Sequence, residues 1–242
     1  MVVTALGNSI DTRDWDTVSA VRIKDINAAI KSAGTTPPGF VDHVDNDDDI
    51  VQANGDFEPW QLTTDGDSHE ITLEIPMSKI QITKRGKTKH YDSGAALITA
   101  KLELLPTGQD PDPDKQLNLL VMAQPTTEAP ISVDSCKLED GDPIAEIYLG
   151  SVLQKWLNAN ATKFTHVFAA VMLHKAIDET ANFSWLKPTY AAYAFGRNRK
   201  NPSNSILAIL NMTQHRKPTG KAFQVEQSMI PAQDNAAFAI SK

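Results

Sequence analysis

Apolar side chains recur at helical spacing from Trp15 to Ser32, and at alternating positions through much of the chain that follows. At about 100° per residue, one broad arc of the first stretch collects five aliphatic side chains, while lysines lie opposite. We therefore predict a long amphipathic helix over residues 15–32, capped by Asp16 or Thr17 and ended at Gly34. Its core-facing residues are Val18, Val21, Ile23, Ile26 and Ile30.

Two charged residues, Arg22 and Asp25, fall inside this apolar arc at i, i+3 spacing. We interpret them as a surface pair whose aliphatic stems cross the edge of the sheet. A buried functional pair is the alternative interpretation.

Alternation of apolar and polar residues predicts strands in most of the remaining chain. Residues 70–77 place Ile71, Leu73, Ile75 and Met77 on one face, and Ile80 and Ile82 continue the pattern. A second helix is predicted near 143–161. Further strands are predicted at 95–105, 116–122, 164–174, 190–195, 205–212 and 222–229. Because a single long helix facing many strands must bury its apolar face in the sheet, we predict an α+β fold in which a curved sheet wraps around the N-terminal helix.

The charge of the chain is unevenly distributed. The net charge is −7, but residues 1–180 hold 28 acidic and 15 basic residues, whereas residues 181–242 hold 2 and 8. Three basic groups at predicted turns are candidates to bind lipid head groups or another anion, with solvated hairpin tips as the alternative. They are Lys84, Arg85, Lys87 and Lys89, then Arg197, Arg199 and Lys200, then Arg216 and Lys217. The acidic chain as a whole argues against nucleic acid as a partner.

Motifs for catalysis and for cofactors are missing from the sequence. It has no nucleophile elbow, no phosphate-binding loop and no dinucleotide fingerprint, and Cys136 is its single cysteine. The acidic run at 42–49 has the spacing of a calcium loop at Asp45, Asp47 and Asp49, but lacks the required glycine and terminal glutamate. We interpret this run as a solvated loop and predict no enzymatic activity, no cofactor and no metal site.

Several stretches carry a resemblance to a known family. They are residues 15–18 running into 21–30, 57–60, 183–189, 190–195 and 206–212. Together they resemble the accessory proteins of clostridial neurotoxin clusters, namely the OrfX proteins and the 47-kilodalton non-toxic protein, which are grouped with the tubular lipid-binding (TULIP) proteins. The resemblance implies a TULIP-like roll of long antiparallel strands wrapped around the long N-terminal helix. This roll would extend over residues 1–242, either as one domain or as one lobe of a longer two-lobe pattern. It also implies no catalysis, association with membrane lipids including phosphoinositides, and assistance to a co-encoded toxin.

Two main functions follow as hypotheses, beside the alternative of a hydrolase with an unrecognised site. The first is a non-enzymatic lipid-binding or membrane-associating accessory protein, with acyl chains between the N-terminal helix and the sheet or head groups on the basic loops. The second is a structural partner of other proteins of the same gene cluster, with no lipid pocket. The N-terminus has no basic region ahead of its short apolar run, so we expect synthesis in the bacterial cytoplasm without a signal peptide, with later release left open.

Overall fold

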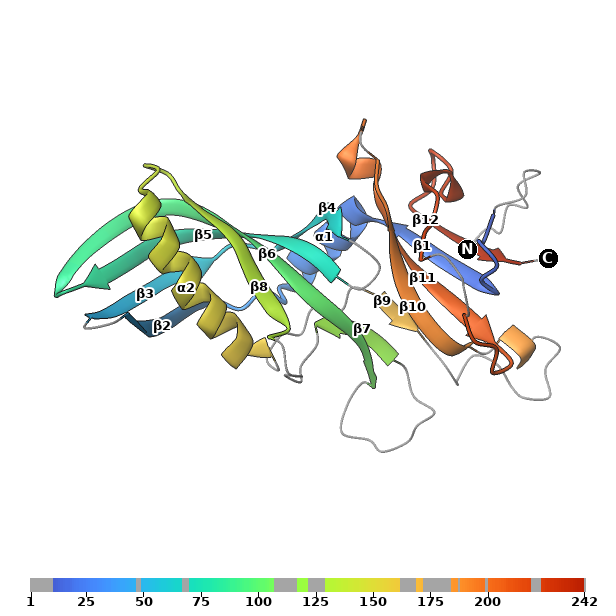
Figure 1. Cartoon of the computed structure of the whole chain (residues 1–242). Coiled ribbons are helices and arrows are strands. Elements are labelled where there is room, and N and C mark those ends of the chain that lie inside the picture. Colours follow the sequence, from blue (N-terminus) through green and yellow to red (C-terminus); the bar gives the residue numbers. More distant parts are fainter. Residues whose placement is uncertain are drawn as a thin grey trace.

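Two antiparallel sheets and two helices make up the computed structural model of the chain (Figure 1). It describes residues 11–46, 49–66, 70–106, 117–121, 129–161, 169–171, 184–186, 188–198, 200–218 and 223–241. The α+β class and the antiparallel strands predicted from the sequence are confirmed.

The larger sheet has the strand order β2 (Gly39–Asn46), β3 (Asp49–Phe57), β5 (Glu70–Lys84), β6 (Lys87–Pro106), β7 (Leu117–Val121), β9 (Ala169–Val171). In addition, β4 (Gln61–Gly66) pairs with β5, and β8 (Ile131–Leu138) pairs with β6. Its centre is the long β5–β6 hairpin, which turns at Arg85 and Gly86 with φ of 50° and 68°. The predicted strand from residue 70 onward and the predicted basic hairpin tip are therefore confirmed.

The smaller sheet has the order β10 (Pro188–Gly196), β11 (Ile206–Thr213), β1 (Thr17–Arg22), β12 (Ala236–Ile240). All eight residues of β11 are buried, as expected for a strand covered on both faces. Short 3₁₀ turns lie at Ser184–Leu186, Pro202–Asn204 and Gln227–Met229. The sheet thus joins the N-terminal strand to strands from the last quarter of the chain.

The two helices differ in what they cover. Helix α1 (Ile23–Ala33) follows β1 directly and contacts β4, and it ends at Gly34 with φ of 60°. Helix α2 (Pro143–Ala159) packs against β8 on one side and against β2 and β3 on the other. Since β2 and β8 are the outer strands at this end of the larger sheet, α2 fills the gap between them (Figure 1).

The N-terminal helix is shorter than predicted, because residues 17–22 form β1 instead. The segment Thr-Val-Ser-Ala-Val-Arg also fits a period of two, and pairing with β11 and β12 on both sides decides in favour of a strand. The predicted caps Asp16 and Thr17 are therefore wrong, since Arg22 is the N-cap residue, whereas the end at Gly34 is confirmed.

The predicted core-facing set divides accordingly between two cores. Ile23, Ile26 and Ile30 are buried in the large core, and Val21 packs against it, whereas Val18 belongs to a second core around Trp15 on the smaller sheet. The helix that lies across the end of the large sheet is α2, which confirms the second predicted helix.

Arg22 is buried rather than on the surface. Only 4% of it is exposed, and its guanidinium donates to the main-chain oxygens of Asp234 at 2.8 Å and of Pro231 at 2.7 Å. Arg22 thereby ties the C-terminal segment to the end of β1.

Three other expectations need correction or fall outside the described chain. Residues 42–46 and 49 lie in β2 and β3, so most of the predicted acidic loop is strand, and residues 47–48 lie outside the described residues. Of the strand predicted at 164–174, only Ala169–Val171 is described. Residues 223–229 form an irregular segment and a 3₁₀ turn, so the strand predicted at 222–229 is wrong where it is described.

Candidate functional site

Polar side chains of α2 bond to the main chain of β8 along its outer edge. Asn158 accepts from the N–H of Ile131 at 3.1 Å, and Gln154 accepts from the N–H of Val133 at 2.6 Å. Both side-chain amides also donate to the Ile131 carbonyl, at 2.8 and 2.7 Å. An edge strand presents unpaired main-chain groups, so these amides occupy the place of a neighbouring strand.

Further along the same edge, Glu146 accepts from the N–H of Leu138 at 3.0 Å. Residues 146, 150, 154 and 158 follow one another at i+4 steps and therefore share one face of α2. The residue at the second of these positions is Gly150, which has no side chain to offer. The series of polar contacts is interrupted there.

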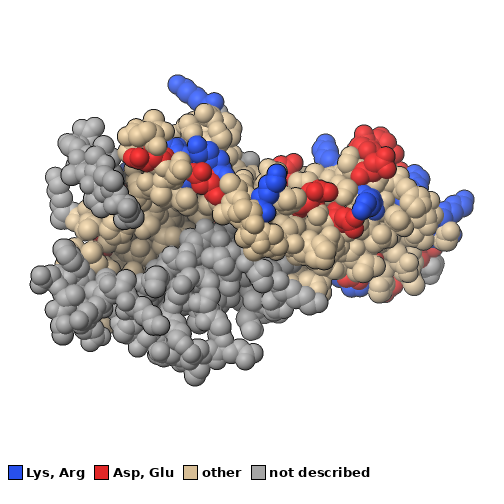
Figure 2. All heavy atoms as spheres, turned by 180° about the vertical axis from the view of Figure 1, so that it is seen from behind, with Lys and Arg blue, Asp and Glu red and all other residues tan. Residues whose placement is uncertain are grey.

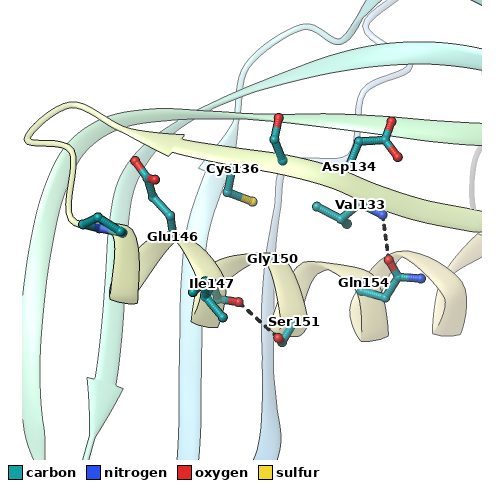
Figure 3. A pocket seen from close by; sticks show the side chains of 10 residues that line it. Val133, Asp134, Cys136, Glu146, Ile147, Gly150, Ser151 and Gln154 are labelled. Atoms are coloured by element: carbon teal, nitrogen blue, oxygen red, sulfur yellow. Dashed lines mark hydrogen bonds between the residues drawn. The ribbon is translucent and has the colours of Figure 1, made fainter.

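A groove of about 510 Å³ lies at this interruption, between β8 and α2. Figure 3 shows Gly150 between Glu146 and Gln154 on the helix, with Cys136 and Asp134 on the strand. The full lining is Val133, Asp134, Ser135, Cys136, Pro143, Glu146, Ile147, Gly150, Ser151 and Gln154.

Asp134 and Glu146 are the charged residues of this lining, and no lysine or arginine belongs to it. Asp134 accepts from the Thr99 hydroxyl at 2.7 Å, and Glu146 holds the edge of β8 as described above. The pKa of the Cys136 thiol is raised to about 12, first by burial and then by the charge of Glu146. The thiol is therefore protonated at neutral pH and is a poor nucleophile.

Two large apolar side chains are exposed on α2, and one of them lines the groove. Ile147, which lines it, is 67% exposed, and Ile144 one turn earlier is 64% exposed. Exposed apolar side chains next to a hollow make this part of α2 a candidate binding surface.

Most of the basic residues at the β5–β6 tip are engaged by acidic or aromatic groups. Arg85 pairs with Asp49 at 2.6 Å, and Lys89 pairs with Asp142 at 2.6 Å. Lys84 donates to the Tyr148 hydroxyl and lies 4.3 Å from the centre of its ring. Lys87 is exposed and has no ion pair among the described residues.

These pairs shift the ionisation of the groups involved. Hydrogen bonding to Asp49 raises the pKa of Arg85, and the reverse effect lowers the pKa of Asp49. The pKa of Asp142 is lowered to about 2, first by its hydrogen bond from Lys89 and then by those from the N–H of Ala145 and from Tyr91.

The other two basic groups flank β11 at its opposite ends. Arg197 donates to the Thr64 carbonyl at 3.1 Å and Lys200 is exposed, both in the loop before β11. After β11, Arg216 pairs at 2.7 Å with the buried Asp16, and Lys217 is exposed. Arg199 lies outside the described residues.

The structure therefore does not bring the three predicted basic groups together. The tip belongs to the larger sheet, and eight strand residues separate the other two groups. Figure 2 shows lysine and arginine interspersed with aspartate and glutamate on the face that it draws.

Sequence reasoning missed Gly150, Gln154 and Asn158 as residues that shape a site. The available signal was the i+4 series of polar residues and one glycine inside an otherwise apolar helix. Among the described residues, no three His, Cys, Asp or Glu side chains are grouped closely enough to bind a metal ion. In the same part of the chain, no helix has the length and apolar character needed to span a membrane.

Comparison with known proteins gives one family. Residues 12–242 match the OrfX-like family model, described as protein OrfX2/OrfX3/P47. The chain is 28% identical to protein OrfX3 of Paraclostridium bifermentans, covering 95% of this chain and 51% of that protein. It is 29% identical to protein OrfX3 of Clostridium botulinum (strain Kyoto / Type A2), covering 96% and 52%.

Solved structures of similar fold include P47 of Clostridium botulinum A2, with a TM-score of 0.76 at 17% identity. That match covers 96% of this chain and 52% of P47. P47 of Clostridium botulinum E1 matches with a TM-score of 0.73 at 16% identity, covering 97% and 53%. The chain thus spans about half the length of the relatives that it matches.

Proposed function

This chain belongs to the OrfX-like family, and from that premise we propose that it is a non-enzymatic accessory protein of a toxin gene cluster. It acts by binding another protein of the cluster through the groove between α2 and β8. The observation that carries this proposal is the exposure of Ile147 in the lining of that groove, with the exposed Ile144 one turn before it on α2.

Physical chemistry supports a binding role for this surface. Water-exposed isoleucine side chains lose an unfavourable contact with solvent when a partner covers them, at roughly 25 cal/mol per Å² of apolar area. A hollow beside them lets a partner side chain be enclosed rather than merely touched, which is how interface residues of large effect are arranged.

The absence of catalysis is supported by the chemistry of the groove and by the names of the relatives. The groove pairs a protonated thiol with two carboxylates, one of which already holds the main chain of β8. No histidine lines it, and the relatives are named without an enzymatic activity.

The test is binding of each purified protein of the same gene cluster, measured by isothermal titration calorimetry. Ile144→Asp and Ile147→Asp should each weaken the interaction at least tenfold, because a carboxylate would have to be desolvated at the contact. Val41→Asp is the matched control, since Val41 is 75% exposed on β2 and does not line the groove. Equal affinity of all three variants and the parent would refute the proposal.

Association with anionic membrane lipid is the second candidate function. Its support is the exposure of Lys87, Lys200 and Lys217, each of which has no ion pair among the described residues. A lysine near an anionic surface contributes about 1 kcal/mol, so a face carrying one or two of them binds weakly. The groove suits an acyl chain poorly, because two carboxylates line it.

Sedimentation with phosphatidylserine or phosphoinositide vesicles tests this second function. Binding that falls steeply with salt and is lost in Lys87→Glu would support it. Vesicle binding that Lys87→Glu and salt leave unchanged would exclude docking through the β5–β6 tip.

A further inference from the structure

We propose that two copies of this chain associate through the outer edge of β12, so that their smaller sheets join into one continuous sheet. This surface is separate from the groove, since β12 and α2 lie at opposite ends of the molecule (Figure 1). The inference therefore goes beyond the proposed function and does not depend on it.

Strand β12 is the last strand of the smaller sheet, and its outer edge is open. It pairs with β1 on one side, and no strand of the described residues pairs with it on the other. Its sequence, Ala-Ala-Phe-Ala-Ile, has no charged residue and no proline, and its register with β1 is regular throughout. Charges, prolines and bulges are the features that protect natural edge strands from pairing with another chain. Strand β12 is therefore an unprotected edge.

The outermost strand of the larger sheet, β2, shows the contrast. It contains the charged residues Asp42 and Asp45. In addition, the Lys155 side chain of α2 donates to the main-chain oxygen of His43 at 2.7 Å. An edge that is charged and partly covered in this way is a poor template for a further strand.

The main-chain bonds at the two ends of β12 show which of its residues face outward. The carbonyl of Asn235 accepts from the last residue of β1 at 3.1 Å, and the N–H of Ser241 donates to the residue before β1 at 2.9 Å. Along an antiparallel strand, residues that bond to one neighbour alternate with residues that point away from it. The residues of β12 that direct their N–H and C=O groups away from β1 are therefore Ala236, Phe238 and Ile240.

The side chains of these same residues are exposed to solvent. Phe238 is 52% exposed and Ile240 is 42% exposed, and Ala236 is exposed as well. Ala239, on the opposite face, is buried in the core around Trp15. The open edge thus combines free main-chain groups with apolar side chains that a second strand would cover.

This edge is complementary to itself. A twofold axis at Phe238 places Phe238 opposite Phe238 of the second copy, and Ala236 opposite Ile240 of the second copy. Each facing pair exchanges two main-chain hydrogen bonds, a small side chain meets a large one beside the axis, and no like charges meet. A shift of two residues would leave one outward residue of each copy unpaired. The occupant that fits this edge is therefore a second copy, in an isologous contact that closes as a dimer.

The size of the contact predicts a weak dimer. A whole phenylalanine offers about 200 Å², so an exposure of 52% leaves about 100 Å² of Phe238 to be covered. Even with Ile240 and the main-chain edge, the contact stays below the roughly 1,200–2,000 Å² of stable specific interfaces. We therefore expect the two copies to associate reversibly at high protein concentration.

Sedimentation velocity of the whole chain tests the association. Between about 10 µM and about 1 mM protein, a range suited to a contact of this size, the average mass should rise from that of one chain toward that of two. Phe238→Lys places like charges opposite each other at the axis and should weaken the dimer at least tenfold. Val41→Lys is the matched control, because Val41 is an exposed apolar residue on β2, and it should leave the dimer unchanged. Circular dichroism should show both variants folded.

Two outcomes of this experiment would overturn the inference. The first is a parent protein that remains a monomer throughout the concentration range. The second is a dimer that folded Phe238→Lys forms as readily as the parent, since the contact would then lie elsewhere.

Disulfide trapping tests the register. A mixture of Ala236→Cys and Ile240→Cys should form a covalent dimer on oxidation, because facing Cα atoms lie about 5.5 Å apart, within the range of a disulfide. Each variant alone places its two cysteines four residues out of register, about 13 Å apart, and should not crosslink. The parent, with its buried Cys136, is the control. Equal crosslinking by either variant alone, or none in the mixture, would contradict pairing about Phe238.

Failure of this inference is distinguishable from failure of the proposed function. Phe238 does not line the groove, so Phe238→Lys should bind the cluster protein as the parent does. If Phe238→Lys instead abolishes that binding and the parent is a monomer, the edge of β12 takes a strand from another protein and the second copy is refuted.

Discussion

Removing the side chains of Gln154 and Asn158 together should cost more stability than the sum of the two single removals. Both side-chain amides donate to the same acceptor, the carbonyl of Ile131, at 2.7 and 2.8 Å. Either single replacement by alanine leaves that carbonyl with one donor, whereas the double replacement leaves it with none.

The magnitude follows from which groups lose their partners. Gln154→Ala loses two hydrogen bonds, and Asn158→Ala loses three, because Asn158 also donates to the main-chain oxygen of Gln154 at 2.8 Å. At about 0.5–1.5 kcal/mol net apiece, the predicted losses are about 1–3 and about 1.5–4.5 kcal/mol. In the double variant the Ile131 carbonyl is also left unsatisfied, and because Ile131 is only 1% exposed, this adds about 1–2 kcal/mol. Alanine also favours the helix at each of the two positions. This contribution is present in both single variants and in the double variant, so it cancels when the double variant is compared with the sum of the two single variants.

Urea unfolding of the parent, both single variants and the double variant gives the coupling free energy directly. The control pair is Gln154→Ala with Ser151→Ala, because the Ser151 hydroxyl donates to the Ile147 carbonyl within α2. That pair should be additive. If the Gln154 and Asn158 variants are also additive to within about 0.5 kcal/mol, the shared acceptor does not stabilise the edge of β8 and the reasoning fails.

Three further predictions concern other charged or polar groups. Arg22→Ala removes two short hydrogen bonds from a buried guanidinium to main-chain carbonyls, and should lower the free energy of unfolding by about 3 kcal/mol or more. The control is Arg13→Ala, which removes an ion pair at a side chain that is 40% exposed and should lower it by under about 1 kcal/mol in the same urea assay. Equal losses would contradict the burial argument. Because Lys89 lowers the pKa of Asp142 to about 2, below the value of about 3.9 in an unfolded chain, the charged carboxylate stabilises the fold above about pH 4 and this contribution is lost as the pH falls through about 2. The difference in melting temperature between the parent and Asp142→Asn, which keeps a capping side chain, should therefore shrink over that range, and a constant difference would refute it. With its pKa raised to about 12, Cys136 should react with a disulfide reagent at pH 8 at least a hundredfold more slowly in the folded protein than in urea, and rates within tenfold would show that the thiol is accessible.

The parts of the fold that the sequence predicted well are those in which one periodicity fits and the other does not. In β5, Ile71, Leu73 and Ile75 alternate with polar residues and have no helical repeat. In α2, buried residues at 149, 152, 153 and 157 have no alternation. Local spacing therefore decided both elements before any tertiary contact was known.

Residues 17–22 show why the same method failed for β1. Val18, Ala20 and Val21 suit a helix arc and a two-sided strand equally well, so spacing cannot choose between them. The choice is made by β11 and β12, whose residues pair with β1 on both sides from 184 to 223 positions away in sequence. Those hydrogen bonds are long-range tertiary information that no local window contains.

The basic residues illustrate the same limit for the candidate site. In sequence, Lys84, Arg85 and Lys89 form a run of positive charge that suggests binding to an anionic surface. In the fold, Asp49 and Asp142 arrive from other strands and turns to pair with two of the three. The groove is the opposite case, since Gly150 is inconspicuous in sequence and gains meaning only when β8 lies beside it. The role proposed for Ile147 depends on tertiary structure in the same way, since its exposure beside the groove is set by how α2 packs against β8, and the Ile147→Asp variant tests that statement directly.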